Sequence, residues 1–260
     1  MPSRPAPEFA GSAELRAIPV WGIDEVMRGD SLADLIVDAL ALGGLRFHVG
    51  DILVIKHKIV SKAEGRTVEL TSIRPSSAAR QFASRNKTDA RLVELAMREA
   101  KRIVRKKHVL ITETKHGFVC ANSGVDVSNV DGGATAVLLP LDPDKSAAKI
   151  VRQLKKRTSL HIPVIIADSF GRAWREGLNE AAIGVAGMDP IRDYRGQRDT
   201  YGYEMHATEE CIADELACAA GLVCGKDTLI PACIIRGYRY RRGNGNARQI
   251  VRPASRDLFR

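Results

Sequence analysis

Two aspartates in separate polar stretches are the first candidates for chemistry. Asp126 lies in HGFVCANSGVDVSNVDGG (116–133), with Asn129 three residues later, and Asp168-Ser169 follows the apolar run PVIIA. Carboxylate, amide and hydroxyl oxygens are the ligands that Mg²⁺ and Mn²⁺ prefer. Two alternatives stay open: Asp126 and Asn129 could form Asx turns with their own backbone, and Asp168 could cap a helix.

A lysine in VSKAEGR (60–66) is the second feature. Lys62 lies where we expect a tight strand exit before Gly65, and an ammonium group there can bind a phosphate as a point charge; an exposed lysine facing water is the alternative. Two carboxylates with nearby basic groups predict a site for a metal–nucleotide complex. Neither GxxxxGKS nor GxGxxG occurs, so P-loop and dinucleotide-binding folds are not predicted.

Strands and helices, predicted from alternating patterns along the chain, must position these residues. Apolar, β-branched runs predict strands, and apolar residues at helical spacing predict helices, so we expect a mixed α/β fold. In such folds, ligands bind at the carboxyl ends of buried strands, where we expect Asp168 and Ser169. The predicted strands are 52–60, 108–114, 163–168 and 229–236, and the predicted helices are 31–42 (with Ser31 as N-cap), 88–107, 144–157 and 209–223.

Length and composition fit an ordinary globular protein. The chain has 260 residues, 45% of them hydrophobic and 27% charged, enough for one large domain or two intertwined ones. It has no apolar run of about 18 residues and no signal-peptide core in MPSRPAPEFAGS, so we expect a cytoplasmic protein with a flexible tail over 1–12. The five cysteines stand singly, which argues against a disulfide framework or a zinc site.

The chain carries a positive excess. Lysine and arginine number 40 against 31 aspartates and glutamates, for a net charge of +9. Such a surplus attracts nucleic acids, nucleotides or phosphorylated metabolites. An RNA-binding protein is therefore a competing hypothesis, although aromatic residues for stacking make up only 5% of the chain. A solvated basic face is the plainer interpretation of the cluster Lys101, Arg102, Arg105, Lys106 and Lys107.

An ordered set of motifs resembles the coenzyme F-420-0:L-glutamate ligase family, the F-420 γ-glutamyl ligases. The stand-alone bacterial form is the more similar one, because no nitroreductase-like region follows. The resemblance runs from about residue 15 to the C-terminus. Its segments, in family order, are GIDEVMRGDSLADLI, GDILVIKHKIVSKAEGR, TETKHGFVCANSGVDVSNV, LPLDPD, IIADSFGRAWREG, AIGVAGM, DYRGQRDTYG and RGNGNARQIVRPASRDLFR.

The resemblance implies one ligase region over 13–260 with the mixed α/β fold of this family. It implies GTP-dependent addition of L-glutamate to F-420-0, and then of γ-linked glutamates, through an acyl phosphate. It also implies two divalent ions (Mg²⁺ or Mn²⁺), with K⁺ as a further candidate, and a homodimer that acts without nucleic acid or membrane. The same chemistry on a variant F-420 precursor stays an open alternative.

Residue by residue, the resemblance places the first metal ion on Asp126 and Asp168 and a second on Ser169, and it adds Lys62 to both aspartates as the catalytic set. Lys226 stands where the archaeal loop has a glutamate ligand, and a protonated lysine cannot bind Mg²⁺. Either water and phosphate oxygens hold the second ion, or Lys226 supplies its charge. The implied GTP contacts are Ile23, Asp24, Glu25, Val26, His57, Lys58, Lys62, Asn129, Cys224, Gly225, Lys226, Asp227, Thr228, Leu229 and Ile230.

The roles of five further polar residues are open. His116 precedes the Asp126 loop, where it could act as a general base or position the loop by hydrogen bonding. Asp193, Arg195, Asp199 and Glu204 could contact the deazaflavin or the glutamate.

Overall fold

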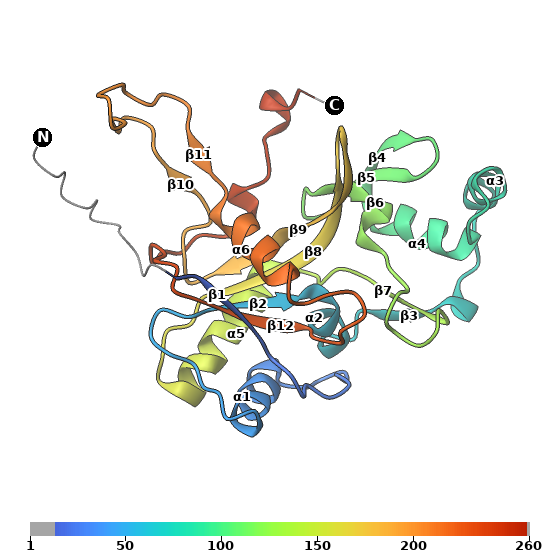
Figure 1. Cartoon of the computed structure of the whole chain (residues 1–260). Helices are drawn as coiled ribbons and strands as arrows, with labels where there is room; N and C mark the ends of the chain where they lie inside the picture. Colours follow the sequence, from blue (N-terminus) through green and yellow to red (C-terminus); the bar gives the residue numbers. More distant parts are fainter. Residues whose placement is uncertain (1–13, 259–260) are drawn as a thin grey trace, which may run out of the picture.

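A computed structural model describes residues 14–258 (Figure 1), so the tail predicted over 1–12 lies outside the described residues. The centre of the molecule is a five-stranded sheet in the order β1-β12-β2-β8-β9. Only β2 and β8 run parallel; the other neighbours are antiparallel. Its strands are β1 (Arg16–Pro19), β2 (Ile52–Lys56), β8 (Val164–Arg172), β9 (Arg175–Ala186) and β12 (Ala232–Arg236).

Helices cover both faces of this sheet. Helices α1 (Leu32–Leu42) and α5 (Pro143–Thr158) lie on one face and α6 (Ile212–Gly221) on the other (Figure 1). The strand residues Ile52–Ile55 and Val164–Ala167 are therefore buried. A strand covered on both faces needs a continuous apolar run, which ILVI and VIIA supply.

A smaller layer flanks the central sheet. It contains α3 (Ser77–Asn86), α4 (Ala90–Glu99) and a sheet of β4 (Ala100–Lys106), β5 (Leu110–Thr114) and β6 (Val119–Ala121). Phe82, Val93 and Leu110 form part of its own apolar core. The pair β3 (Thr67–Glu69) and β7 (Thr135–Val137) and the short helices η1 (Leu70–Ser72) and η2 (Asn122–Gly124) complete it.

A two-stranded arm and a C-terminal segment extend from the body (Figure 1). The arm pairs β10 (Arg192–Asp193) with β11 (Glu209–Glu210). The C-terminal segment contains η3 (Ala247–Gln249) and η4 (Ala254–Arg256). Helix α2 (His57–Ala63) follows β2 directly and forms one wall of the site described below.

The predicted mixed α/β class is confirmed, and most predicted elements are present. The helices expected over 31–42, 144–157 and 209–223 correspond to α1, α5 and α6. The strands expected over 108–114 and 229–236 are the somewhat shorter β5 and β12. Within residues 14–258, no helix is long and apolar enough to cross a membrane. A division into two subdomains stays a prediction.

The strand predicted over 52–60 is wrong in its second half. Strand β2 ends at Lys56, and residues 57–63 form α2, whose His57, Ile59, Val60 and Ser61 are buried. Packing of this turn outweighs the β-propensity of its Ile and Val residues. Lys62 consequently lies in the last turn of a helix and not at a strand exit.

The helix predicted over 88–107 is also wrong in its second half. Helix α4 is capped by the Asp89 carboxylate and ends at Glu99, after which β4 pairs antiparallel with β5. Pairing with a distant strand leaves no mark on local periodicity, which explains the error. The basic cluster Lys101–Lys107 therefore begins on an edge strand whose Lys101 and Arg102 both contact Glu113.

Candidate active site

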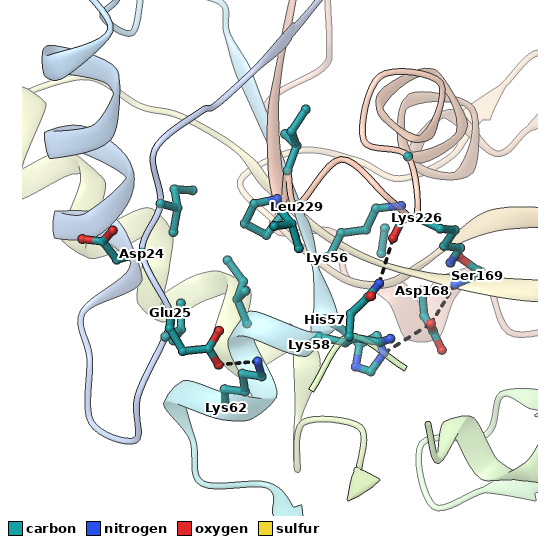
Figure 2. A pocket seen from close by; sticks show the side chains of 18 residues that line it. Asp24, Glu25, Lys56, His57, Lys58, Lys62, Asp168, Ser169, Lys226 and Leu229 are labelled. Carbon is teal, nitrogen blue, oxygen red and sulfur yellow. Dashed lines mark hydrogen bonds and ion pairs between the residues drawn. The ribbon is translucent and has the colours of Figure 1, made fainter. Parts of the chain in front are cut away.

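A cavity of about 260 Å³ lies where β2 runs into α2, between β8 and two loops (Figure 2). Most of the predicted nucleotide contacts line it, but Cys224, Asp227 and Thr228 do not. The lining residues are Ile23, Asp24, Glu25, Val26, Lys56, His57, Lys58, Ile59, Lys62, Asn129, Ala167, Asp168, Ser169, Gly225, Lys226, Leu229, Ile230 and Pro231.

The first two residues of α2 contact the two predicted metal-binding aspartates. His57 Nε2 lies 3.3 Å from Asp168 Oδ1 (Figure 2), and Lys58 Nζ lies 2.7 Å from Asp126 Oδ2. Asp168 comes from β8 just beyond Ala167, which is the last residue of β8 paired with β2. Asp126 comes from the loop before β7 and is bridged by backbone to Val137. Two adjacent residues of one helical turn therefore contact two carboxylates that are 42 positions apart in the sequence.

Both carboxylates are held in the ionised form. Burial raises the pKa of Asp126, but hydrogen bonds from Lys58 and Ser128 outweigh it and lower the value to about 2. Burial likewise opposes ionisation of Asp168, but His57 and the Ser169 amide outweigh it, so its pKa also lies below the ordinary value. The Asp126 charge acts in the opposite direction on Asp168, because two nearby carboxylates repel each other.

Of the two structural roles considered for the aspartates, the Asx turn at Asp126 is present and the helix cap at Asp168 is not. Asp126 does form an Asx turn, since Oδ1 accepts from the Ser128 amide at 2.9 Å, and it contacts Lys58 as well. Asp168 does not cap a helix. It lies inside β8, which continues to Arg172, so the expectation that Asp168 ends its strand is wrong. The strand continues because residues 168–172 pair with β9 beyond the edge of β2.

Ser169 lies between a carboxylate and an ammonium group. Its hydroxyl donates to Glu180 Oε1 at 2.8 Å and accepts from Lys226 Nζ at 2.5 Å. Glu180 is the register partner of Ser169 on β9, and its Oε1 also lies 2.5 Å from Lys56 Nζ. The other oxygen of Glu180, Oε2, is buried without a hydrogen-bond partner.

Two further contacts close the cavity. At its mouth, Lys62 Nζ lies 2.5 Å from the exposed carboxylate of Glu25 (Figure 2). Across it, Asn129 Nδ2 donates to the Lys226 carbonyl at 2.9 Å, which joins the Asp126 loop to the loop over 224–230. The predicted nucleotide contacts thus come from four separate segments that meet at one cavity.

Two carboxylates of the site could act as ligands of a divalent ion. Within the described residues, no three His, Cys, Asp or Glu side chains are close enough to hold a metal ion. Asp126 and Asp168 supply two ionised carboxylates, and Mg²⁺ at phosphate sites takes one or two carboxylates and completes its shell with water and phosphate oxygens. The donor types of this pair therefore suit one ion, which would replace Lys58 at Asp126 and His57 at Asp168. At Ser169 the fit fails, because the hydroxyl already donates to Glu180 and accepts from Lys226.

Several residues named from the sequence lie elsewhere. His116 Nε2 contacts the Leu141 carbonyl at 3.1 Å, which agrees with a positioning role. Asp193 and Arg195 pair with each other at 2.6 Å near the start of the arm. Asp199 and Glu204 belong to the outer part of the arm, in the segment between β10 and β11.

Sequence reasoning missed Lys56 and Glu180. Lys56 is the last residue of β2, and a lysine at a strand end has no distinctive sequence signal. Glu180 comes from β9, which was not predicted, and only the β8–β9 register places it opposite Ser169. If β8 and β9 had been predicted as a hairpin, a carboxylate within the second strand would have pointed to Glu180.

Comparison with known proteins decides the family. The family model described as F420-0:Gamma-glutamyl ligase matches residues 22–237. A protein of Methanothermobacter thermautotrophicus named Coenzyme F420:L-glutamate ligase is 47% identical over 247 residues, covering 94% of this chain and 98% of its own. The chain belongs to the F420-0:gamma-glutamyl ligase family.

Two further relatives carry the same name. One from Methanocaldococcus jannaschii is 46% identical and covers 81% of this chain and 85% of its own length. One from Methanopyrus kandleri is 43% identical and covers 97% of this chain and all of its own. As a member of this family, the protein is an enzyme of the ligase class. These relatives are archaeal, so they give no support to the expected bacterial form.

Proposed function

We propose that this ligase adds L-glutamate to coenzyme F-420-0, and then further γ-linked glutamates, in F420 biosynthesis, with conversion of GTP to GDP and phosphate. The names of its relatives support the glutamate and F420 parts of this proposal. The cavity supports the nucleotide part. It is lined by Lys56, Lys58, Lys62 and Lys226, and four ammonium groups suit a polyphosphate.

One observation carries the proposal: the first turn of α2 contacts Asp126 and Asp168 beside this lysine-lined cavity. A carboxylate substrate is a poor electrophile until one of its oxygens becomes a good leaving group. Phosphorylation does this, but it brings an anionic carboxylate to an anionic triphosphate. Positive charge at the site must therefore screen both.

The proposed reaction has two steps. In the first, the terminal carboxylate of the F-420-0 tail attacks the γ-phosphorus of GTP, and the bond to the bridging oxygen breaks to release GDP. In the second, the α-amine of glutamate attacks the acyl phosphate carbonyl, loses a proton and expels phosphate as the amide forms. Lys62 and the other cavity lysines hold phosphate oxygens, and so offset the charge that builds on the transferred group.

Asp126 and Asp168 would hold a divalent ion, Mg²⁺ or Mn²⁺, in this proposal. Such an ion would screen the phosphates and polarise the transferred phosphoryl group. The contacts of Lys58 and His57 outweigh the effect of burial, and so keep both carboxylates ionised and in place. A potassium requirement stays a prediction.

The fold, the oligomeric state and the location of the protein extend the proposal. We propose that the arrangement of sheets described above is the ligase fold of this family. We propose that the chain works as a homodimer. We also propose that it acts in the cytoplasm, where GTP and glutamate are available, without nucleic acid or a membrane as partner.

The test is a reconstitution. Purified protein with GTP, Mg²⁺ or Mn²⁺, L-glutamate and F-420-0 should yield glutamylated product by mass spectrometry and an equal amount of GDP per bond formed. Omission of any one component should stop the formation of both the glutamylated product and GDP. Absence of product from the complete mixture would refute the assignment. Glutamylation of a variant precursor in preference to F-420-0 would point to the alternative substrate.

Asp168→Asn sharpens this test, because the change removes one negative charge while keeping the size of the side chain. Turnover should fall at least about a hundredfold, since the proposed ion loses one of its two protein ligands. Circular dichroism and thermal unfolding check that the variant is folded. Wild-type turnover in folded Asp168→Asn would contradict the metal site.

A further inference from the structure

The Ser169 end of the cavity already contains fixed positive charge. Ser169 has one hydroxyl proton, which it donates to Glu180, and it accepts from the Lys226 ammonium group at 2.5 Å. A divalent ion at this hydroxyl would lie next to that ammonium group. Like charges at such a separation repel strongly in a partly buried site. Lys226 must therefore move away before any metal ion can bind Ser169.

The charges around Ser169 leave no excess negative charge for a second cation. Glu180 is the carboxylate behind Ser169, and its side chain is only 9% exposed. Lys56 and Lys226 both line the cavity. With Asp168, which also lines the cavity, two carboxylates face two ammonium groups, so no excess negative charge is left on this wall for a second cation. The Lys226 ammonium group already supplies the positive charge that a phosphate oxygen requires and that a metal ion would otherwise bring.

Lys226 is also held in place at its backbone. Its carbonyl accepts from Asn129 Nδ2 at 2.9 Å, and its ammonium group donates to Ser169. A side chain anchored at both ends loses little further freedom when a ligand arrives, so its charge is preorganised. Glu180 acts through Lys56 and Ser169 and is a positioning residue, because it does not line the cavity itself.

We propose that the ammonium group of Lys226, a residue held at its side chain by Ser169 and at its backbone by Asn129, takes the place of a second divalent ion, so that this ligase binds one divalent ion per chain, at Asp126 and Asp168. The inference rests on the proposed function, since it concerns the same GTP site. It replaces the expectation of two divalent ions with one metal ion and one lysine.

Mn²⁺ binding tests this directly. The free Mn²⁺ signal in electron paramagnetic resonance is titrated against full-length protein saturated with a non-hydrolysable GTP analogue. Wild-type protein should bind one Mn²⁺ per chain. Lys226→Glu should bind two, because a carboxylate then joins Ser169 and Glu180. Lys145→Glu is the matched control with the same change in charge at an exposed position, and it should bind one.

The outcomes separate the two proposals. Two Mn²⁺ per wild-type chain, or one in folded Lys226→Glu, would overturn the lysine substitution and leave the proposed function standing. No Mn²⁺ on the wild-type complex would overturn both.

Lys226→Met serves as a second variant. Affinity for the GTP analogue should fall roughly tenfold to a hundredfold, the usual effect of losing a charged hydrogen bond, with Mn²⁺ still at one per chain. Unchanged affinity would also overturn the inference.

Discussion

The charged groups of the site are already paired with one another. Asp126 contacts Lys58, Asp168 contacts His57, and Lys62 contacts Glu25. A polyphosphate that enters the cavity must exchange these partners for its own oxygens. The cost is small where the partner is exposed to water, and Glu25 is 68% exposed whereas Lys62 is only 11% exposed. Lys62 is therefore the cavity lysine that a nucleotide releases most easily.

Lys62→Met should weaken binding of GTP roughly tenfold or more, because it removes an ammonium group from a partly desolvated cavity wall. Isothermal titration calorimetry with GTP measures the change. Lys145→Met is the matched control at an exposed position and should leave affinity unchanged. Glu25→Gln removes the exposed partner of Lys62, and affinity should stay the same or rise slightly because the nucleotide no longer has to displace that carboxylate. A loss of affinity in Glu25→Gln as large as that in Lys62→Met would show that the ion pair itself shapes the site.

Residue types alone could identify part of the site. Asp168 and Asn129 stand out because polar side chains interrupt apolar runs, and both line the cavity. Glu180 and Lys56 could not be found in this way. Their place beside Ser169 depends on the strand register and on a close ion pair, and neither is encoded locally.

At the scale of elements, the junction of β2 with α2 does the positioning. The run ILVIKHKIV has the composition of one long strand, yet it turns at Lys56 into a helix whose first two side chains contact the two aspartates. The buried half of β2 was predictable, because continuous apolar runs mark strands covered on both faces. The turn was not, because burial of Ile59 and Val60 can be satisfied by either conformation.

The start of α3 offers a pH-dependent test of local stability. Glu94 on α4 accepts from the Ser76 amide at 2.9 Å, and Ser76 is the N-cap of α3. Hydrogen bonds from Ser76 and then Arg98 lower the pKa of Glu94 from 4.5 to about 2. Because the folded-state pKa is depressed, the stabilisation is complete above about pH 4.5 and is lost as the pH falls through about 2.

Glu94→Gln should therefore lower the free energy of unfolding by roughly 1 kcal/mol at pH 7, a modest value because Arg98 is half exposed. Urea unfolding of wild type and variant at pH 7 and near pH 2.5 measures the difference. The difference should stay constant from pH 7 to about 4.5 and shrink only below that pH. A difference that stays constant with pH would mean that the Glu94 charge does not stabilise the α3–α4 corner.

The end of the central sheet where β2 begins, opposite the cavity, contains a buried ion pair. Asp51, which is fully buried just before β2, accepts two hydrogen bonds at 2.8 Å from Arg236 at the end of β12. Arg236→Met should destabilise the protein by about 3 kcal/mol or more, because it leaves Asp51 buried without its partner. Urea unfolding of the single variant and of Asp51→Asn/Arg236→Met tests this. The double variant should be the more stable of the two.

At the scale of the whole molecule, charge attracts anions without choosing among them. The net charge of +9 allowed an RNA-binding protein as well as a nucleotide-dependent ligase. The family match supports the ligase, and two members of the basic cluster, Lys101 and Arg102, are partly neutralised by Glu113. The alternation of strand-like and helix-like patterns predicted the α/β class but not strand order, because order depends on pairings between segments far apart in the chain.

The proposed homodimer makes a simple prediction about mass. Light scattering coupled to size exclusion should give about twice the chain mass of 28.4 kDa at micromolar concentration. The mass should not change with added RNA, since no nucleic acid is proposed as a partner. A single species of one chain mass across the concentration range would refute the dimer without affecting the assignment of the site.

The most direct measurement of the central claim is anomalous X-ray scattering from crystals of the protein with Mn²⁺ and a non-hydrolysable GTP analogue. The account predicts an anomalous peak at the manganese edge bonded to carboxylate oxygens of both Asp126 and Asp168 and to phosphate oxygens of the nucleotide. A fully occupied nucleotide with no manganese between these aspartates, or with manganese bound elsewhere, would contradict it.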